Sequence, residues 1–180
     1  MKKLILLLGL VLLPLVTNAQ NYFDSLEEND DVTAIVVNKN MFKLMSKIDI
    51  DTDDPEAQEY ISLIKNIDDL KVFVSKKPDV SAKMHDMMNQ YRKKANLEEL
   101  MRVKDKDANV KFYFKQGSNE DKVAELLMFV TGINDVNVNG GNVETVLLSL
   151  TGDIDLKQIS KLTNEMDLPG GKHLKKAEKK

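Results

Sequence analysis

Residues 122–131 read KVAELLMFVT, and residues 143–151 read VETVLLSLT. Both runs are rich in strand-forming residues, and in both the apolar side chains fall at odd and at even positions. Successive side chains of a strand point to opposite faces of the sheet, so this pattern predicts strands that are buried on both faces. We therefore expect these two strands at the centre of a sheet, under helices.

Two further β-rich runs precede them, at residues 99–105 (ELMRVKD) and 110–115 (VKFYFK). Turn-forming residues at 107–109 and 117–119 separate the first three runs, and a longer loop at 134–142 leads to the last. Connections of this kind predict a C-terminal four-strand antiparallel meander. The second run alternates two sets of side chains, Val110, Phe112 and Phe114 against Lys111, Tyr113 and Lys115, so the face of the second set should be wet.

The first half of the chain alternates between β and helical periods. VTAIVVN (32–38) is apolar on both parities and predicts a strand buried on both faces, and LKVFVSK (70–76) predicts another strand. Three helices are predicted from apolar stripes at spacings of three and four. Their apolar positions are Met41, Leu44, Met45 and Ile48; Ala57, Tyr60, Ile61, Ile64 and Ile67; and Val80, Met84, Met87, Met88, Tyr91 and Ala95.

A last helix is expected from Leu156 to about Met166. The predicted order is β-α-α-β-α-β-β-β-β-α, which is an α+β domain. We expect a mostly antiparallel sheet with the helices packed on one face.

The N-terminus resembles a secretory signal peptide. Lys2 and Lys3 precede an apolar run that is shorter than the about 20 residues needed to span a bilayer. Thr17 and Ala19 are small residues suited to signal peptidase, so we expect cleavage after Ala19 and a chain that begins at Gln20. No cysteine follows the run to carry a lipid. The expected location is the periplasm or cell envelope, with a soluble chain after cleavage.

Composition limits the classes of partner. The remaining chain of about 160 residues fits one domain, 20–171, followed by a basic tail at 172–180. The chain has no cysteine, so its stability must come from apolar burial rather than disulfides. Without Lys2 and Lys3 there are 24 basic and 29 acidic residues, a net charge of −5, and an acidic body of this kind argues against nucleic acid.

The tail has the opposite charge. Five lysines stand there against Glu178, which leaves the preceding body near −9. The tail is expected to be unstructured, either as a solvated segment that aids solubility or as a weak peripheral contact with anionic lipid headgroups. Its lysines are Lys172, Lys175, Lys176, Lys179 and Lys180.

Asp49, Asp51 and Asp53 alternate as in a calcium-binding loop. Counted from Asp49, however, loop position 6 is Asp54 rather than glycine, and position 12 is Tyr60 rather than glutamate. Pro55 suits the first position of a helix, which makes Asp54 the N-cap and places the acidic side chains at the positive end of the helix dipole. We interpret the aspartates as a helix start, with an adventitious calcium site as the alternative.

The chain offers little for catalysis. Its two histidines are His85, on the flank of a predicted helix, and His173, in the tail. A zinc site needs three or four converging ligands, and nothing resembles the motif around a catalytic serine. Met84, Met87 and Met88 could bind copper, but their match to the helix face favours a role in the core. No cofactor is predicted.

The closing segment VETVLLSLTGDIDLKQISKLTNEM (143–166) has a strand-turn-helix pattern in which Asp155 and Gln158 form a capping box. This segment, the signal ending in NAQ and the length resemble a family of small exported proteins of Gram-negative bacteria, catalogued as domain of unknown function 4252. The resemblance implies an envelope or periplasmic location. Many members carry a lipid-attachment cysteine that this chain lacks, and no functional residue is carried over.

Two functions are considered. The first is a non-catalytic exported protein that binds an unknown envelope protein or ligand through the wet sheet face or the 134–142 loop. The residues expected on that partner surface are Lys111, Tyr113, Lys115, Asn137 and Asn139. The second is a hydrolase or metal-dependent enzyme that uses the Asp49–Glu56 carboxylates or His85. The lack of a catalytic constellation favours the first.

Overall fold

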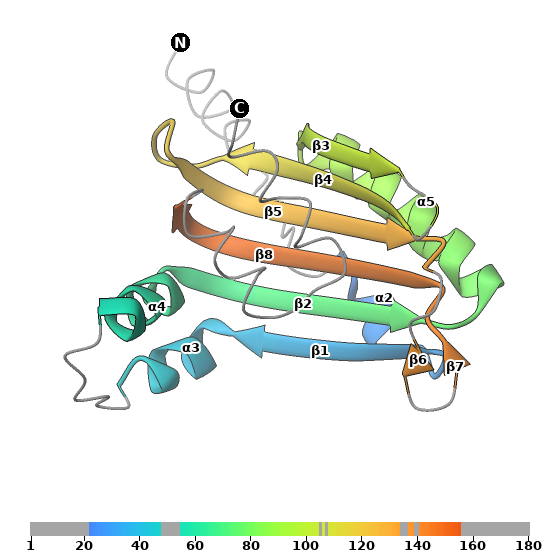
Figure 1. The fold of residues 1–180 in the computed structure, drawn as a ribbon, viewed down its shortest axis with the longest axis horizontal. Helices are drawn as coiled ribbons and strands as arrows, with labels where there is room; N and C mark the ends of the chain where they lie inside the picture. The colour runs from blue at the N-terminus through green and yellow to red at the C-terminus, as the bar shows by residue number, and fades with distance from the viewer. Residues whose placement is uncertain are drawn as a thin grey trace, which may run out of the picture.

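The domain is built on one six-stranded antiparallel sheet with the strand order β1-β2-β8-β5-β4-β3 (Figure 1). The computed structural model describes residues 22–47, 55–104, 106, 108–133, 137–138 and 141–155. The six strands are β1 (Val32–Asn38), β2 (Ile67–Ser75), β3 (Glu98–Lys104), β4 (Asn109–Gln116), β5 (Lys122–Thr131) and β8 (Thr145–Asp155). The protein is therefore an α+β domain with a mostly antiparallel sheet.

Four helices and a small hairpin complete the described part. The helices are α2 (Asp24–Glu27), α3 (Lys39–Met45), α4 (Pro55–Lys65) and α5 (Pro78–Lys94). Two short strands, β6 (Asn137–Val138) and β7 (Gly141–Asn142), pair with each other outside the main sheet. Helix α4 begins at Pro55, as the sequence predicts.

Strands β5 and β8 lie side by side in the middle of the sheet, which confirms the prediction from their apolar pattern. Leu126, Met128 and Val130 of β5 are buried on one face of the sheet. Leu127 and Phe129 of the same strand are buried on the other face. A strand with this pattern needs cover on both sides, and only the central positions of a sheet provide it.

The helices do not share one face, so that part of the prediction is wrong. Helices α2 and α5 cover the face that carries Phe73, Leu127 and Leu147, and they lie behind the strands in Figure 1. Phe42 of α3 and Leu63 of α4 belong to the core of the opposite face. Because the central strands are apolar on both faces, a one-sided arrangement would leave half of their side chains without cover.

The position of β1 also differs from its prediction. VTAIVVN reads as a strand buried on both faces, yet β1 is an edge strand, and its side chains are half-buried or exposed. Among the residues that the structure describes, β1 pairs with β2 alone, through its inner side. An edge strand has a neighbour on one side only, so its apolar side chains receive less cover than those of a central strand.

Several sequence predictions fall outside the described residues. These are the signal segment to Gln20, Asp49 to Asp54, Asn139, the helix expected after Asp155, and the lysines of the tail. Among the residues that the structure does describe, no helix is long and apolar enough to cross a membrane.

Candidate functional site

The two outer strands of the sheet differ in how they are protected against pairing. Strand β3 carries four charged residues out of seven, Glu98, Glu99, Arg102 and Lys104. Arg102 Nη2 lies 2.7 Å from Glu99 Oε2, and the pairing of β3 with β4 shifts register between Glu99 and Met101. Charged side chains and bulges are the usual means of preventing another strand from adding to an edge. The β3 edge is therefore blocked.

Strand β1 has none of these protections. Its seven residues include no charge and no proline. Its register with β2 runs without a shift from Val32 opposite Ser75 to Asn38 opposite Asp69. Within the part of the chain that the structure describes, no strand pairs with its outer side. The unpaired N–H and C=O groups of this regular strand can accept another strand.

Exposed apolar side chains lie on β1 and on α3, the helix that follows it. On β1, Ile35 is 52% and Val36 43% exposed; on α3, Met41 is 51% and Leu44 62% exposed. The only other exposed large apolar side chain among the described residues is Leu100 of β3, at 42%. Helix α3 follows β1 directly and extends past the end of the edge (Figure 1). We call the outer edge of β1 together with Ile35, Val36, Met41 and Leu44 the β1 edge surface.

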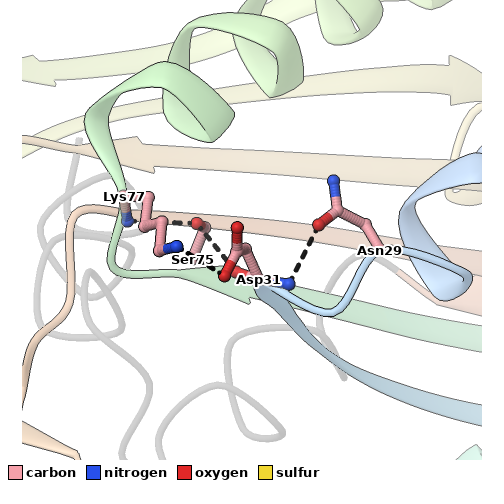
Figure 2. A network of polar contacts seen from close by, with 4 residues as sticks. All are labelled: Asn29, Asp31, Ser75 and Lys77. Atoms are coloured by element: carbon pink, nitrogen blue, oxygen red, sulfur yellow. Dashed lines mark hydrogen bonds and ion pairs between the residues drawn. The ribbon is translucent and has the colours of Figure 1, made fainter.

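Polar contacts hold the start of β1 in place (Figure 2). Lys77 Nζ lies 2.8 Å from Asp31 Oδ1, the Ser75 hydroxyl donates to the Asp31 carbonyl at 3.1 Å, and the Lys77 amide donates to Ser75 Oγ at 3.2 Å. The Asp31 amide in turn donates to Asn29 Oδ1 at 2.9 Å. These contacts join the strand start to the end of β2 and hold the edge in an extended form.

The other end of β1 is held in a similar way. The Asn38 side chain caps α3 by accepting from the amides of Asn40 and Met41, at 3.0 and 3.2 Å. Lys39 forms an ion pair with Asp68, which precedes Asp69, the residue of β2 that pairs with Asn38. Asp31 and Lys39, which have opposite charges, thus flank the two ends of the uncharged strand β1.

The sheet face predicted to be wet is mostly covered. Tyr113 is buried beneath α5, and the Arg92 guanidinium lies 5.1 Å above its ring. Burial raises the pKa of the Tyr113 hydroxyl, with the guanidinium opposing the shift. Lys111 is half-buried, and only Lys115 is exposed. Tyr113 therefore cannot belong to an exposed partner surface, because α5 packs over this row of side chains.

The remaining predicted residues do not assemble into a site. Asn137 lies in β6, and the structure describes no side chain for it. His85 is half-buried and contacts Asn89 at 3.2 Å, the Phe129 ring at 5.7 Å and Asp86 at 3.9 Å. Among the described residues, no group of three or more His, Cys, Asp or Glu side chains could hold a metal ion.

Comparisons with known proteins identify the family. A family model described as a domain of unknown function, DUF4252, matches residues 22–162. The chain belongs to this family. The matched region of the DUF4252 domain contains every described strand and helix, including the β1 edge surface. No match was found among curated proteins or among solved structures.

Sequence reasoning missed one buried ionisable pair in this DUF4252 domain. Glu125 of β5 is buried, and its Oε1 atom has no partner among the described atoms. Burial raises the pKa of the Glu125 carboxyl, while a hydrogen bond from Tyr91 and the charge of Lys115 oppose the shift. Burial and Glu125 together raise the pKa of Tyr91. The available signal was one acidic residue in the interior of an apolar strand, KVAELLMFVT, whose other charged residue, Lys122, stands at its first position.

Replacing Glu125 by glutamine is expected to make stability less sensitive to pH. Because the pKa of Glu125 is raised above its ordinary value of 4.5, its contribution to stability is fully present below that value and is lost as the pH rises through the raised pKa. Glutamine keeps an acceptor for Tyr91 but does not ionise. The Glu125→Gln variant should therefore be more stable than wild type at neutral pH, with the difference shrinking toward acid pH.

Urea denaturation at a series of pH values measures this effect. Glu120→Gln, at an exposed position in the turn before β5, is the matched control and should follow the wild type. If the difference in free energy of unfolding between Glu125→Gln and wild type stayed constant with pH, the pKa of Glu125 would not be raised by folding.

Proposed function

We propose that this DUF4252 domain is a non-catalytic interaction module of the cell envelope that binds its partner by strand addition at the β1 edge surface. The observation that carries the proposal is the contrast between the two edges of one sheet. The β3 edge is charged and shifted in register, whereas the β1 edge is uncharged, regular and lined by exposed apolar side chains. Natural sheets usually protect both edges, so an edge that no described strand pairs with and no charge protects suggests a place for a partner.

The chemistry of the β1 edge surface suits an extended segment. In strand addition the backbone hydrogen bonds supply affinity and alternate side chains supply specificity. Ile35 and Val36 point to opposite faces of the sheet, so an added strand meets an apolar side chain on each face. Met41 and Leu44 extend this apolar contact beyond the end of the strand. We propose the β1 edge surface as the partner surface instead of the sheet face around Tyr113, because Tyr113 is buried.

A cross-linking experiment in the cells that produce the protein tests this function. A photo-reactive amino acid is placed at Ile35, and separately at Leu100, which is similarly exposed on the opposite edge. We expect an adduct of higher mass from position 35 and none from position 100. The absence of an adduct at position 35, or equal adducts at both positions, would reject strand addition at β1.

Export is part of the proposal and is supported by the basic residues, apolar run and small residues of the first nineteen positions. If Ala19 ends a signal peptide, intact-mass analysis of the accumulated protein should give a chain that begins at Gln20 or its cyclised form. A chain that retains the whole apolar run would contradict export by this route.

A further inference from the structure

We infer that the β1 edge surface binds the β1 edge of a second copy of the same chain, so that two sheets join into one across a twofold axis. This inference rests on the proposed function, because it names the partner for the same surface. It depends on whether the sequence of β1 is complementary to itself when two copies run antiparallel. Three features of the edge bear on this question.

The first feature is the pairing of side chains. An antiparallel arrangement centred on Ile35 sets Ile35 opposite Ile35 of the second copy and Val36 opposite its Ala34. Opposed residues then have the same parity, so they lie on the same face of the joined sheet, as cross-strand pairs must. The centre of the interface is therefore apolar on both faces. Val37 meets Thr33 on one of those faces, and the methyl group of Thr33 can contact it.

The second feature is the charge at the two ends. Continued one residue beyond each end of β1, the same register brings Asp31 near Lys39 of the second copy, once at each end of the interface. Each side chain already has a partner within its own chain, Lys77 for Asp31 and Asp68 for Lys39. Asp31 is nevertheless 40% exposed and Lys39 54% exposed, so each remains accessible to a further opposite charge. Two parallel copies would instead bring like charges together at each end.

The third feature is the apolar surface of α3. Because α3 continues past Asn38, the arrangement places it beside the segment that precedes Val32 of the second copy. Met41 and Leu44 are exposed in the single chain, and this contact would cover them. The apolar side chains of β1 and α3 thus contribute to one interface that repeats under the twofold axis, as expected for an isologous dimer.

A cysteine substitution tests the register directly, because the natural chain has no cysteine. Residues directly opposite in an antiparallel pair have Cα atoms about 4.5 to 5.5 Å apart, which suits a disulfide. Under mild oxidation, Ile35→Cys should form a covalent dimer that reductant dissolves. Leu100→Cys, on the blocked edge, is the matched control and should stay monomeric on a non-reducing gel. Equal covalent dimer from both variants would overturn the inference.

Sedimentation equilibrium tests the dimer without a cross-link. The sample is the protein purified from the cells that produce it, with whatever N-terminal processing it has undergone there. The wild type and Leu100→Lys should each have twice the monomer mass. Ile35→Lys should raise the dissociation constant at least about tenfold, because it places two lysines at the centre of the interface. Circular dichroism should show the same secondary structure for all three proteins.

A dimer that Ile35→Lys leaves intact, species larger than a dimer, or a wild type that is monomeric at every attainable concentration would each overturn the inference. The monomeric result, combined with a position-35 photo-adduct to a different protein, would leave the proposed function standing with another partner. The absence of any photo-adduct at position 35 would reject both.

Discussion

Met88→Ala is expected to lower the free energy of unfolding by about 2 to 5 kcal/mol, the usual cost of truncating a fully buried methionine. Met88 lies on the inner side of α5 and has no exposed surface. It belongs to the core between α5 and the sheet, together with Phe73, Leu127 and Phe129. Truncation would leave a cavity in the layer that attaches α5 to the central strands. The loss can be measured by urea denaturation.

Met87→Ala is the matched control, since it removes the same atoms from the neighbouring position. Met87 is only half-buried and lies at the rim of that core, where the Ser25 hydroxyl is 3.9 Å from its sulfur. We expect its truncation to cost clearly less than that of Met88. Equal losses would show that the rim of α5 is packed as tightly as its centre. The apolar stripe of the sequence places Met84, Met87 and Met88 in the core, and the structure buries Met84 and Met88 fully but Met87 only in part.

Gly152→Ala is expected to cost about 2 to 5 kcal/mol, since it combines backbone strain with a steric overlap. Gly152 of β8 has a φ of 155°, a backbone conformation that residues other than glycine rarely adopt. A Cβ atom there would lie 2.1 Å from the carbonyl oxygen of Asn66 and 3.0 Å from the Cα atom of Ile67. Both obstacles are backbone atoms, so the β2–β8 pairing itself would have to move. The register shift of that pairing lies at the same place, between Ile67 and Asp69.

Gly132→Ala separates the two contributions. Gly132 also has a positive φ, 61°, but the nearest atom to its added Cβ would be Nδ2 of Asn109, at the end of a movable side chain. Its substitution should lower the free energy of unfolding only by the cost of the backbone strain, about 1 to 2 kcal/mol. If thermal and urea denaturation gave the two variants the same loss, the overlap with Asn66 would not be a real constraint.

Local chemistry was enough to predict the parts of the fold that depend on short segments. The apolar residues at both parities placed β5 and β8 at the centre of the sheet, and Pro55 marked the start of α4. The stripe of α5 correctly selected Val80, Met84, Met88 and Tyr91 as buried. In each case the information lies within one strand or one helix, because the period of the side chains follows from the geometry of the element.

The candidate site could not be predicted in this way. VTAIVVN has the same two-sided apolar pattern as the central strands, yet it forms the edge, where Ile35 and Val36 are exposed. Tyr113 alternates with lysines and reads as a wet position, yet α5 covers it. Glu125 was not singled out in the sequence, yet it is buried against Tyr91.

The sequence by itself determined which segments form strands and helices and which strands are apolar enough to be central, since these depend on side-chain type and period. Only the tertiary structure decided which apolar strand lies at the edge and which sheet face a helix covers. The physical reason is that exposure depends on neighbours supplied by distant parts of the chain. The residues of a strand indicate how apolar each of its two faces is. Whether the strand lies at the edge of the sheet depends instead on whether another strand pairs beside it.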